Sequence, residues 1–335
     1  MTPARPAAFV IPERANLAIL LAVWSAVLGL LWIGSHAPLP WALAAAALFA
    51  VVNMTPFCLM HEAVHGVFST DPSRNYAFGV VCAAIFPTSY TLQRIAHLSH
   101  HRRNRTDTDL YDYYLPDQSK ALRDFWLIGG NLLGLYWFCI PISNLVYVLA
   151  PWIYTSEWFS RGPARYLGFE AHVREIARHG VLRIWLECVL AFAYQATVFV
   201  ALDLDPIRWL LCYGAFALHW SALQYVDHAW SPRHVVHGAW NLRVGRIARA
   251  FALNYHDHLA HHRFPAAPWT YLPGLVDPSE AQPSFWSIYR SLWRGTRPAP
   301  PLLDDVGYEE ARRRRTSSVT TTPITRPPTA PPTPA

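Results

Sequence analysis

The stretch from Asn254 to His262 constrains the fold of this chain more than any other, because it places four histidines within nine residues. His258, His261 and His262 stand at positions i, i+3 and i+4, which share one face of a helix. Neutral imidazoles that converge in this way are typical ligands of zinc, iron, copper or nickel. The fold must therefore bring this helical face to a metal site.

Two further segments repeat the pattern. His97, His100 and His101 have the same spacing, and His61 and His65 stand at i and i+4. One ion rarely takes eight imidazole ligands, so the sequence predicts two metal ions held between three helical segments. The isolated histidines are interpreted as structural residues, and they are His36, His172, His179, His219, His234 and His237.

The composition indicates a membrane protein, since 53% of the residues are hydrophobic and only 15% are charged, against about 25% charged in soluble domains. The net charge of +6 comes from arginines dispersed between apolar segments, which favours a basic surface beside a membrane and excludes a nucleic-acid-binding face. The five cysteines stand singly in apolar runs, so no disulfide framework or iron–sulfur site is predicted.

Four long apolar segments predict transmembrane helices at residues 16–34, 41–60, 181–202 and 207–223. Arginines in the first fifteen residues place the N-terminus in the cytoplasm, and the turns at 36–40 and 203–206 outside. All three histidine clusters then lie on the cytosolic side. This organisation divides the chain into a cytosolic tail over 1–15, a membrane domain over 16–295 and a disordered Pro- and Thr-rich tail over 296–335.

The remaining segments are shorter or more polar. Residues 76–87 are apolar but too short to span a bilayer. The run 125–152 is interrupted by Pro141 and Pro151 and carries arginine on both flanks, so we expect a re-entrant or interfacial helix pair. Residues 156–183 are expected to form a polar helical segment on the cytosolic surface.

The sequence allows two functions of other classes beside a two-metal enzyme. His61-Glu62-Ala-Val-His65 matches the HExxH motif of zinc peptidases, in which Glu62 is the general base. An intramembrane zinc peptidase needs only three protein ligands, however, and would leave two histidine clusters unused. A metal or lipid transporter needs ionisable residues within its spans, and the four predicted spans contain few of them.

The three clusters resemble the histidine boxes of the membrane fatty acid desaturase family. They read HEAVH at 61–65, HLSHH at 97–101 and HLAHH at 258–262, with the flanking text HHRRNRTDTD and HHRFPAAPWTYLP. The resemblance covers roughly residues 16–290. It implies an all-α integral membrane protein, with about four transmembrane helices under a cytosolic helical cap that carries a non-haem di-iron site.

The resemblance also implies the ligands. They are His61, His65, His97, His100, His101, His258, His261 and His262. Some desaturases add a histidine four residues after an amide side chain that holds a water, and His228 and Gln224 match that spacing with Gln in place of Asn. His256 is a rival ligand, but at i−2 from His258 it should point away. Carboxylates and amides near the boxes are expected to orient the ligands, with the candidates Glu62, Asp107, Asp109, Asp227, Asn254 and Asp257.

The expected reaction is O2-dependent attack on an unactivated C–H bond of a fatty acyl chain by an enzyme with two iron ions. Desaturation is the first expectation. The same superfamily also contains hydroxylases and decarboxylase-like members, so hydroxylation and decarboxylation of a fatty acid to a terminal alkene remain open. No haem or flavin motif is visible, so electrons are expected from a separate ferredoxin- or haem-type partner with its reductase. In a bacterium the enzyme would lie in the cytoplasmic membrane.

Overall fold

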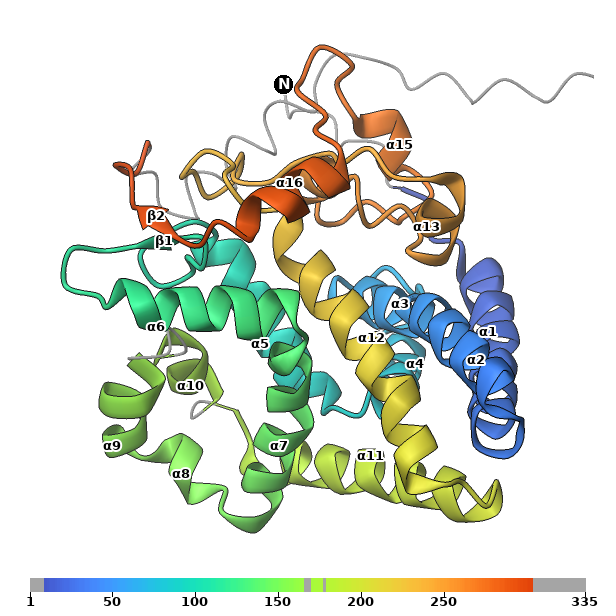
Figure 1. Ribbon diagram of the computed structural model, residues 1–335. Coiled ribbons are helices and arrows are strands. Elements are labelled where there is room, and N and C mark those ends of the chain that lie inside the picture. The colour runs from blue at the N-terminus through green and yellow to red at the C-terminus, as the bar shows by residue number, and fades with distance from the viewer. Residues whose placement is uncertain (1–8, 166–169, 177–178, 304–335) are drawn as a thin grey trace, which may run out of the picture.

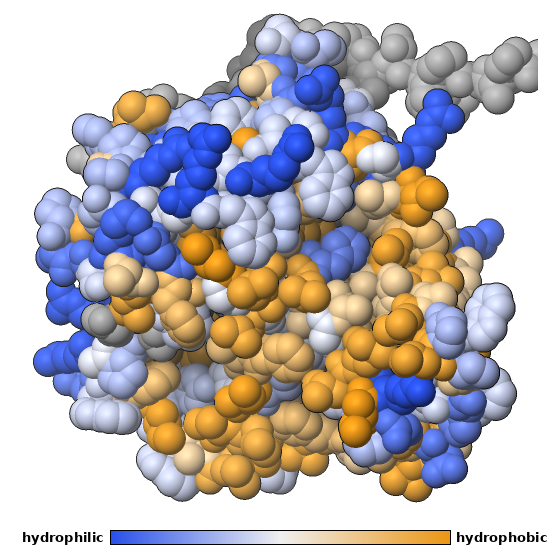
Figure 2. Space-filling model, viewed as in Figure 1, coloured by the Kyte–Doolittle hydropathy of each residue, from blue (hydrophilic) through white to orange (hydrophobic). Residues whose placement is uncertain are grey.

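A computed structural model describes residues 9–165, 170–176 and 179–303 of the chain, and almost all of its regular structure is helical (Figure 1). The long helices lie together in one part of the molecule, and short helices and loops cover one end of them. Apolar side chains gather over the long helices, while polar side chains gather over the covered end and one flank (Figure 2). This division into an apolar stem and a polar cap is what a protein with one part in lipid requires.

Three helical segments are long and apolar enough to cross a membrane by length and composition. They are α1 (Glu13–His36), the run Leu39–Val64 that consists of α2 (Leu39–Val52) and α3 (Met54–Val64), and α11 (Val181–Ala201). They correspond to the first three predicted spans, with α1 beginning three residues before the predicted boundary at residue 16. Their outward faces carry exposed leucines such as Leu21, Leu43 and Leu186, which suits contact with lipid.

The prediction of a fourth span at 207–223 is not supported. The segment forms α12 (Pro206–Val226), which has 21 residues, as many as α11, yet it is not among the candidate spans. Its Arg208, His219 and Gln224 lower its mean hydropathy. Because α12 packs against α1 and α2 and buries residues such as Phe216 and Trp220, most of its surface faces protein.

The run 125–152 forms a bent pair of helices, in agreement with the expected helix pair. One arm is α6 (Lys120–Phe125) continued by the π-helix η1 (Trp126–Leu132), the other is α7 (Leu135–Leu149), and the bend is 89°. Taken together the two arms reach the length and hydropathy of a broken span or a re-entrant loop. The bend is at Gly134, whose φ of 87° and close approach to the backbone of Ala217 exclude a side chain.

The short apolar stretch at 76–87 lies in α4 (Pro72–Ile85), which packs against α3 and α11. Next comes α5 (Tyr90–Arg103), which carries the second histidine cluster. Its N-terminus is held by Glu187 of α11, whose carboxylate accepts hydrogen bonds from the Thr91 backbone N–H at 2.7 Å and the Ser89 hydroxyl at 2.6 Å. A carboxylate at this end of a helix satisfies its free N–H groups.

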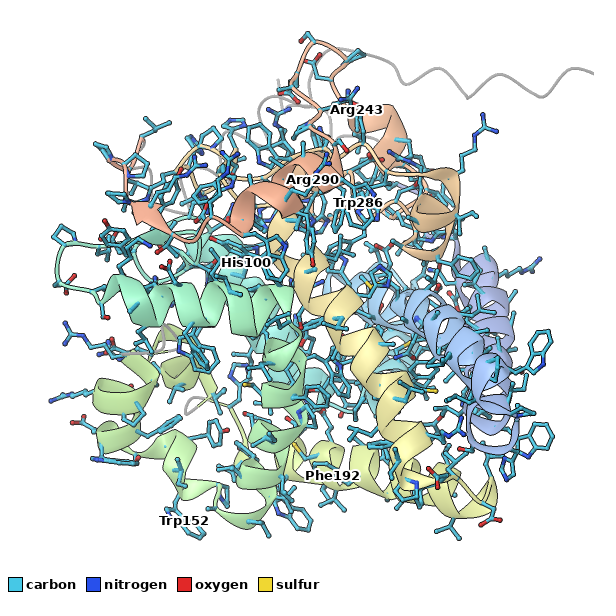
Figure 3. All side chains as sticks on the ribbon, viewed as in Figure 1. His100, Trp152, Phe192, Arg243, Trp286 and Arg290 are labelled. Atoms are coloured by element: carbon cyan, nitrogen blue, oxygen red, sulfur yellow. The ribbon has the colours of Figure 1, made fainter. Side chains whose placement is uncertain are left out.

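The remaining elements are short. They are β1 (Tyr113–Tyr114), α8 (Trp152–Thr155), α9 (Glu157–Phe159), η2 (Ser160–Ala164), α10 (Glu170–Ile176), α13 (Arg246–Phe251), α14 (His258–Arg263), α15 (Leu272–Leu275), α16 (Phe285–Leu292) and β2 (Arg297–Pro298). The two strands pair in parallel. Figure 3 shows Arg243 and Arg290 at the capped end, and Trp152 and Phe192 at the opposite, apolar end. Residues 1–8 of the predicted N-terminal tail and residues 304–335 of the predicted C-terminal tail lie outside the described residues.

Candidate metal centre

Nine histidines form two sets where the long helices meet the cap, and within each set the possible ligand atoms all lie within 4.8 Å of one another. The first set has five members and the second has four. The first set is His61, His65, His97, His101 and His261, and the second set is His100, His228, His258 and His262. Two groups of this kind are what two separate metal ions would need.

The histidines of one sequence cluster do not all belong to the same set. On α5, His97 and His101 belong to the first set, and His100 between them belongs to the second. On α14 the pair at i and i+4, His258 and His262, belongs to the second set, and His261 belongs to the first. Adjacent residues of a helix point about 100° apart, so each helix can serve two ions that lie side by side.

The spacing of the ring nitrogens fits metal ligation. In the first set, Nε2 of His97 lies 2.8 Å from that of His65 and 2.9 Å from that of His101. In the second set, Nε2 of His228 lies 3.1 Å from that of His100 and 3.0 Å from that of His258. Two nitrogens bound to one ion at about 2.1 Å and a right angle stand about 3 Å apart.

Buried ring nitrogens without partners give the same indication. Nε2 of His61 and both ring nitrogens of His262 are buried and form no hydrogen bond within the part of the chain that the structure describes. A buried polar atom without a partner is costly. A metal ion in each set would give these nitrogens the partner that the protein does not supply.

The electrostatic environment keeps the imidazoles neutral, as ligation requires. Burial lowers the pKa of His97 and His101, on the helix α5, well below the ordinary value. The same cause lowers the pKa of His228, His258 and His262. Neighbouring imidazoles contribute in the same direction, since a second positive charge in the cluster would repel the first.

Two hydrogen bonds fix ring orientation in the second set. Nδ1 of His100 donates to Oδ2 of Asp109 at 2.5 Å, and Nδ1 of His228 donates to the backbone carbonyl of Gly238 at 2.8 Å. With Nδ1 protonated, the lone pair of Nε2 faces the other ring nitrogens of the set. Such partners of ligand histidines fix the tautomer and raise the basicity of the ligand.

Asp227 lies directly behind the same set. It is fully buried, and neither carboxylate oxygen has a hydrogen-bond partner among the described residues. Oδ2 lies 3.5 Å from Nδ1 of His258, and Oδ1 lies 3.9 Å from Nε2 of His228. Burial raises the pKa of Asp227 well above the ordinary range, because it disfavours the charged form of the carboxyl.

Other candidate carboxylates are directed elsewhere. Asp107 pairs with Arg233, and Asp257 pairs with Arg249 at 2.6 Å, so neither points at a histidine. Glu62 adjoins His61 in sequence, but its Oε2 accepts the backbone N–H of Trp269 at 3.0 Å. Of the five predicted orienting carboxylates, the structure brings Asp109 and Asp227 to rings of the second histidine set.

The two candidate amides lie near the boxes but contact other groups. Gln224 accepts the hydroxyl of Tyr255 at 3.4 Å, and its Nε2 is buried without a partner. Asn254 donates to the Trp269 carbonyl at 3.1 Å and has a left-handed φ of 57°. Its side chain ties the chain before α14 to the following loop.

The histidines interpreted as structural lie outside both sets. His219 contacts the Ala50 carbonyl, and His36 and His179 contact carbonyls of their own helices. The rings of His234 and His237 contact each other at an angle of 55°, and His256 is buried outside both sets. The side chain of His172 is not described.

The sequence did not identify the polar groups that surround His228 on the side away from the other histidines of its set. Asn104 donates to the same Gly238 carbonyl that His228 uses, at 3.1 Å. Arg105 bonds both oxygens of Asp112, which also accepts the hydroxyl of Tyr225 at 2.6 Å. This buried network joins the loop after α5 to the end of α12, beside His228. In the sequence, this network is indicated only by the polar segment RRNRTDTD that follows the second histidine cluster.

Comparison with known proteins adds one finding. The family model for fatty acid desaturase matches residues 38–291, which is well over half of the chain and includes all nine histidines of the two sets. No curated protein matches the chain.

Proposed function

The chain belongs to the fatty acid desaturase family, and on that premise we propose that it is a di-iron oxidoreductase that uses O2 to attack an unactivated C–H bond of a fatty acyl chain. Desaturation is the reaction we propose first. The observation that carries the proposal is the pair of histidine sets, five and four imidazoles with their ligand atoms within 4.8 Å. A peptidase zinc would use three ligands and leave one position open.

In the proposed site the first set holds one iron ion and the second set holds the other. When bound, the two ions supply the oxidising chemistry that an aliphatic C–H bond requires, which no protein side chain offers. The protein would hold the ions between α3, α5, α14 and the end of α12, and α3 packs against α5. Asp109 and the Gly238 carbonyl keep His100 and His228 in the tautomer that presents Nε2.

Asp227 and Gln224 are the residues we propose to act beside the ligands. Asp227 would accept the Nδ1–H of His258 and hold that ring in the second set, which lacks the fifth imidazole of the first. The buried amide nitrogen of Gln224 has no hydrogen-bond partner among the described residues, and it would donate to a water near His228. Asn254 and Asp257 act through the position of α14, because their side chains contact the Trp269 carbonyl and Arg249.

The apolar stem supplies the setting for a fatty acyl substrate. Its helices reach the level of the two histidine sets, since α3 ends at Val64 between His61 and His65. We propose that the histidine sets lie on the cytosolic side of the membrane, in reach of a separate electron donor of the ferredoxin or haem type. The arginines around the cap agree with that side.

Product analysis tests the proposal. The protein would be produced in a lipid-rich host with a ferredoxin and its reductase, and fatty acids and hydrocarbons would be compared by mass spectrometry. Loss of two hydrogen atoms from a fatty acid indicates desaturation, gain of one oxygen indicates hydroxylation, and loss of the carboxyl carbon as a terminal alkene indicates decarboxylation. His262→Ala is the inactive control. An unchanged profile with the intact protein fully loaded with iron would refute the proposal.

A further inference from the structure

A polar cleft of about 430 Å³ lies on the flank of the molecule opposite α1, where α6 approaches α10 and the loop before β1 (Figure 1). The proposed reaction assigns no role to this cleft. Its lining includes Tyr111, Arg123, Arg165, Arg174 and Asp117.

Arg123 distinguishes this cleft from an ordinary polar surface. The residue is only 7% exposed, yet it forms no ion pair among the described residues, and its Nε has no hydrogen-bond partner. Its one hydrogen bond is from Nη2 to the backbone carbonyl of Leu110. Arginine is almost never buried unless it is paired, because removal of a charge from water is costly.

The two other buried arginines of the described chain follow that rule. Arg105 bonds both oxygens of Asp112, and Arg233 bonds Asp107. Arg123 is therefore the exception, and it lies at the wall of a cleft large enough to admit a ligand group. The missing partner is an anion that the described residues do not provide.

The other charges of the cleft leave room for such an anion. Arg174 is paired with Glu170, and Asp107 is paired with Arg233 from outside the cleft. Among the described residues that line the cleft, Arg123 and Arg165 then face one acid that is not part of an ion pair, which is Asp117. Guanidinium groups bind carboxylate and phosphate oxygens through two parallel hydrogen bonds.

We propose that Arg123 binds an anionic oxygen ligand, a carboxylate or a phosphate, in this cleft. One source is the carboxylate of a fatty acid, and that assignment rests on the proposed function. The other source is the phosphate of a phospholipid. Bound there, the ligand contacts the segment that holds His100, because Arg123 bonds the carbonyl of Leu110 and the preceding residue, Asp109, accepts the Nδ1–H of His100.

Equilibrium binding without turnover tests this site. The full-length protein in neutral detergent, kept without O2 and reductant, would be titrated with palmitate, with methyl palmitate and with inorganic phosphate. We expect Arg123→Gln to weaken binding of palmitate by about ten-fold or more, since a hydrogen bond to a charged group is lost. Binding of methyl palmitate should not change. Arg174→Gln, at a paired arginine of the same cleft, is the matched control and should change binding less than two-fold.

The outcomes separate the sources. Palmitate binding that depends on Arg123 supports the fatty acid, and phosphate binding that depends on Arg123 while palmitate binding does not supports the phospholipid. If Arg123→Gln binds both anions with the affinity of the unaltered protein, the proposed site is overturned. In that event turnover of fatty acid by the intact enzyme would leave the proposed function standing. Should Arg123→Gln fail to fold, Arg123→Met removes the charge and keeps an unbranched side chain, and unaltered affinity for both anions in that variant would equally overturn the site.

Discussion

Nδ1 of His228 donates a hydrogen bond of 2.8 Å to the backbone carbonyl of Gly238, ten residues further along the chain. Two neighbours fix the orientation of this carbonyl, since Asn104 also donates a hydrogen bond to it and Arg105 packs against Gly238. A side chain at 238 would collide with the His234 carbonyl and with Cγ of Arg105. The orientation of one proposed ligand thus depends on the absence of a side chain at another residue.

Gly238→Ala should therefore displace that carbonyl and weaken metal binding in the second set. We expect the iron content to fall from about two ions towards one per chain, with activity lost, while the protein still inserts in the membrane. Elemental analysis of the purified variant measures this. Gly214→Ala, where an added Cβ meets no atom within 4 Å, is the matched control. Equal iron in both variants would show that the Gly238 carbonyl does not position His228.

Asp109→Ala should loosen His100, which loses the acceptor of its Nδ1–H. Loss of such a partner costs roughly 10- to 100-fold in metal affinity or activity. Competition with a chelator, followed by the rate of iron release, measures the change. Asp107→Ala lies in the same loop and removes a carboxylate that pairs with Arg233, so it should release iron close to the rate of the unaltered protein. The same fast release from both variants would refute a specific role for Asp109.

The stability of the metal-free protein should fall as the pH is lowered. Burial holds the pKa of His101, His228 and His258 well below the ordinary value. The unfolded chain, with histidine pKa values of about 6.5, therefore binds more protons than the folded chain in this range, and the free energy of unfolding rises with pH. Thermal unfolding in detergent from about pH 7.5 to 5.5 measures it. A thermal unfolding midpoint that rises as the pH is lowered would contradict the claim that these buried rings are neutral.

The two ends of the stem should face opposite sides of the membrane. A cysteine at His36 or at Asp203, both exposed at the end away from the histidine sets, should react with an impermeant maleimide added outside the cell. A cysteine at Arg246, exposed beside the cap, should react only after the membrane is opened. Labelling of the Arg246→Cys variant from outside would place the proposed site on the other side.

The histidine spacing was enough to predict which imidazoles the structure brings together, but not their grouping. The spacing places the three histidines of each cluster on one face of a helix, whereas the structure divides those of α5 and those of α14 between two sets. That division follows from the angle between adjacent residues of a helix, and it depends on how α5 and α14 cross, which no local pattern encodes. His228 was found by its spacing from Gln224, but the carbonyl that holds it comes from a loop whose sequence carries no signal.

The membrane segments were predictable where hydropathy alone decides them, as in α1 and α11. The assignment of α12 as a span is not supported by the same measure, because its polar residues lower its hydropathy in a helix that packs against α1 and α2. Pro141 was expected to interrupt the run 125–152, yet α7 continues through it and the break is at Gly134. The break lies at Gly134 because the backbone of Ala217, which is far away in sequence, comes too close there for a side chain.

The metal content of the purified protein tests the central claim most directly. If each histidine set holds one ion, the intact protein should contain about two irons per chain, and His228→Ala should retain one of them and lose turnover. His256→Ala, a buried histidine outside both sets, should keep both irons. A preparation that is fully active with a single zinc ion, or a His228→Ala variant with two irons and normal activity, would contradict a di-iron centre built from these nine histidines.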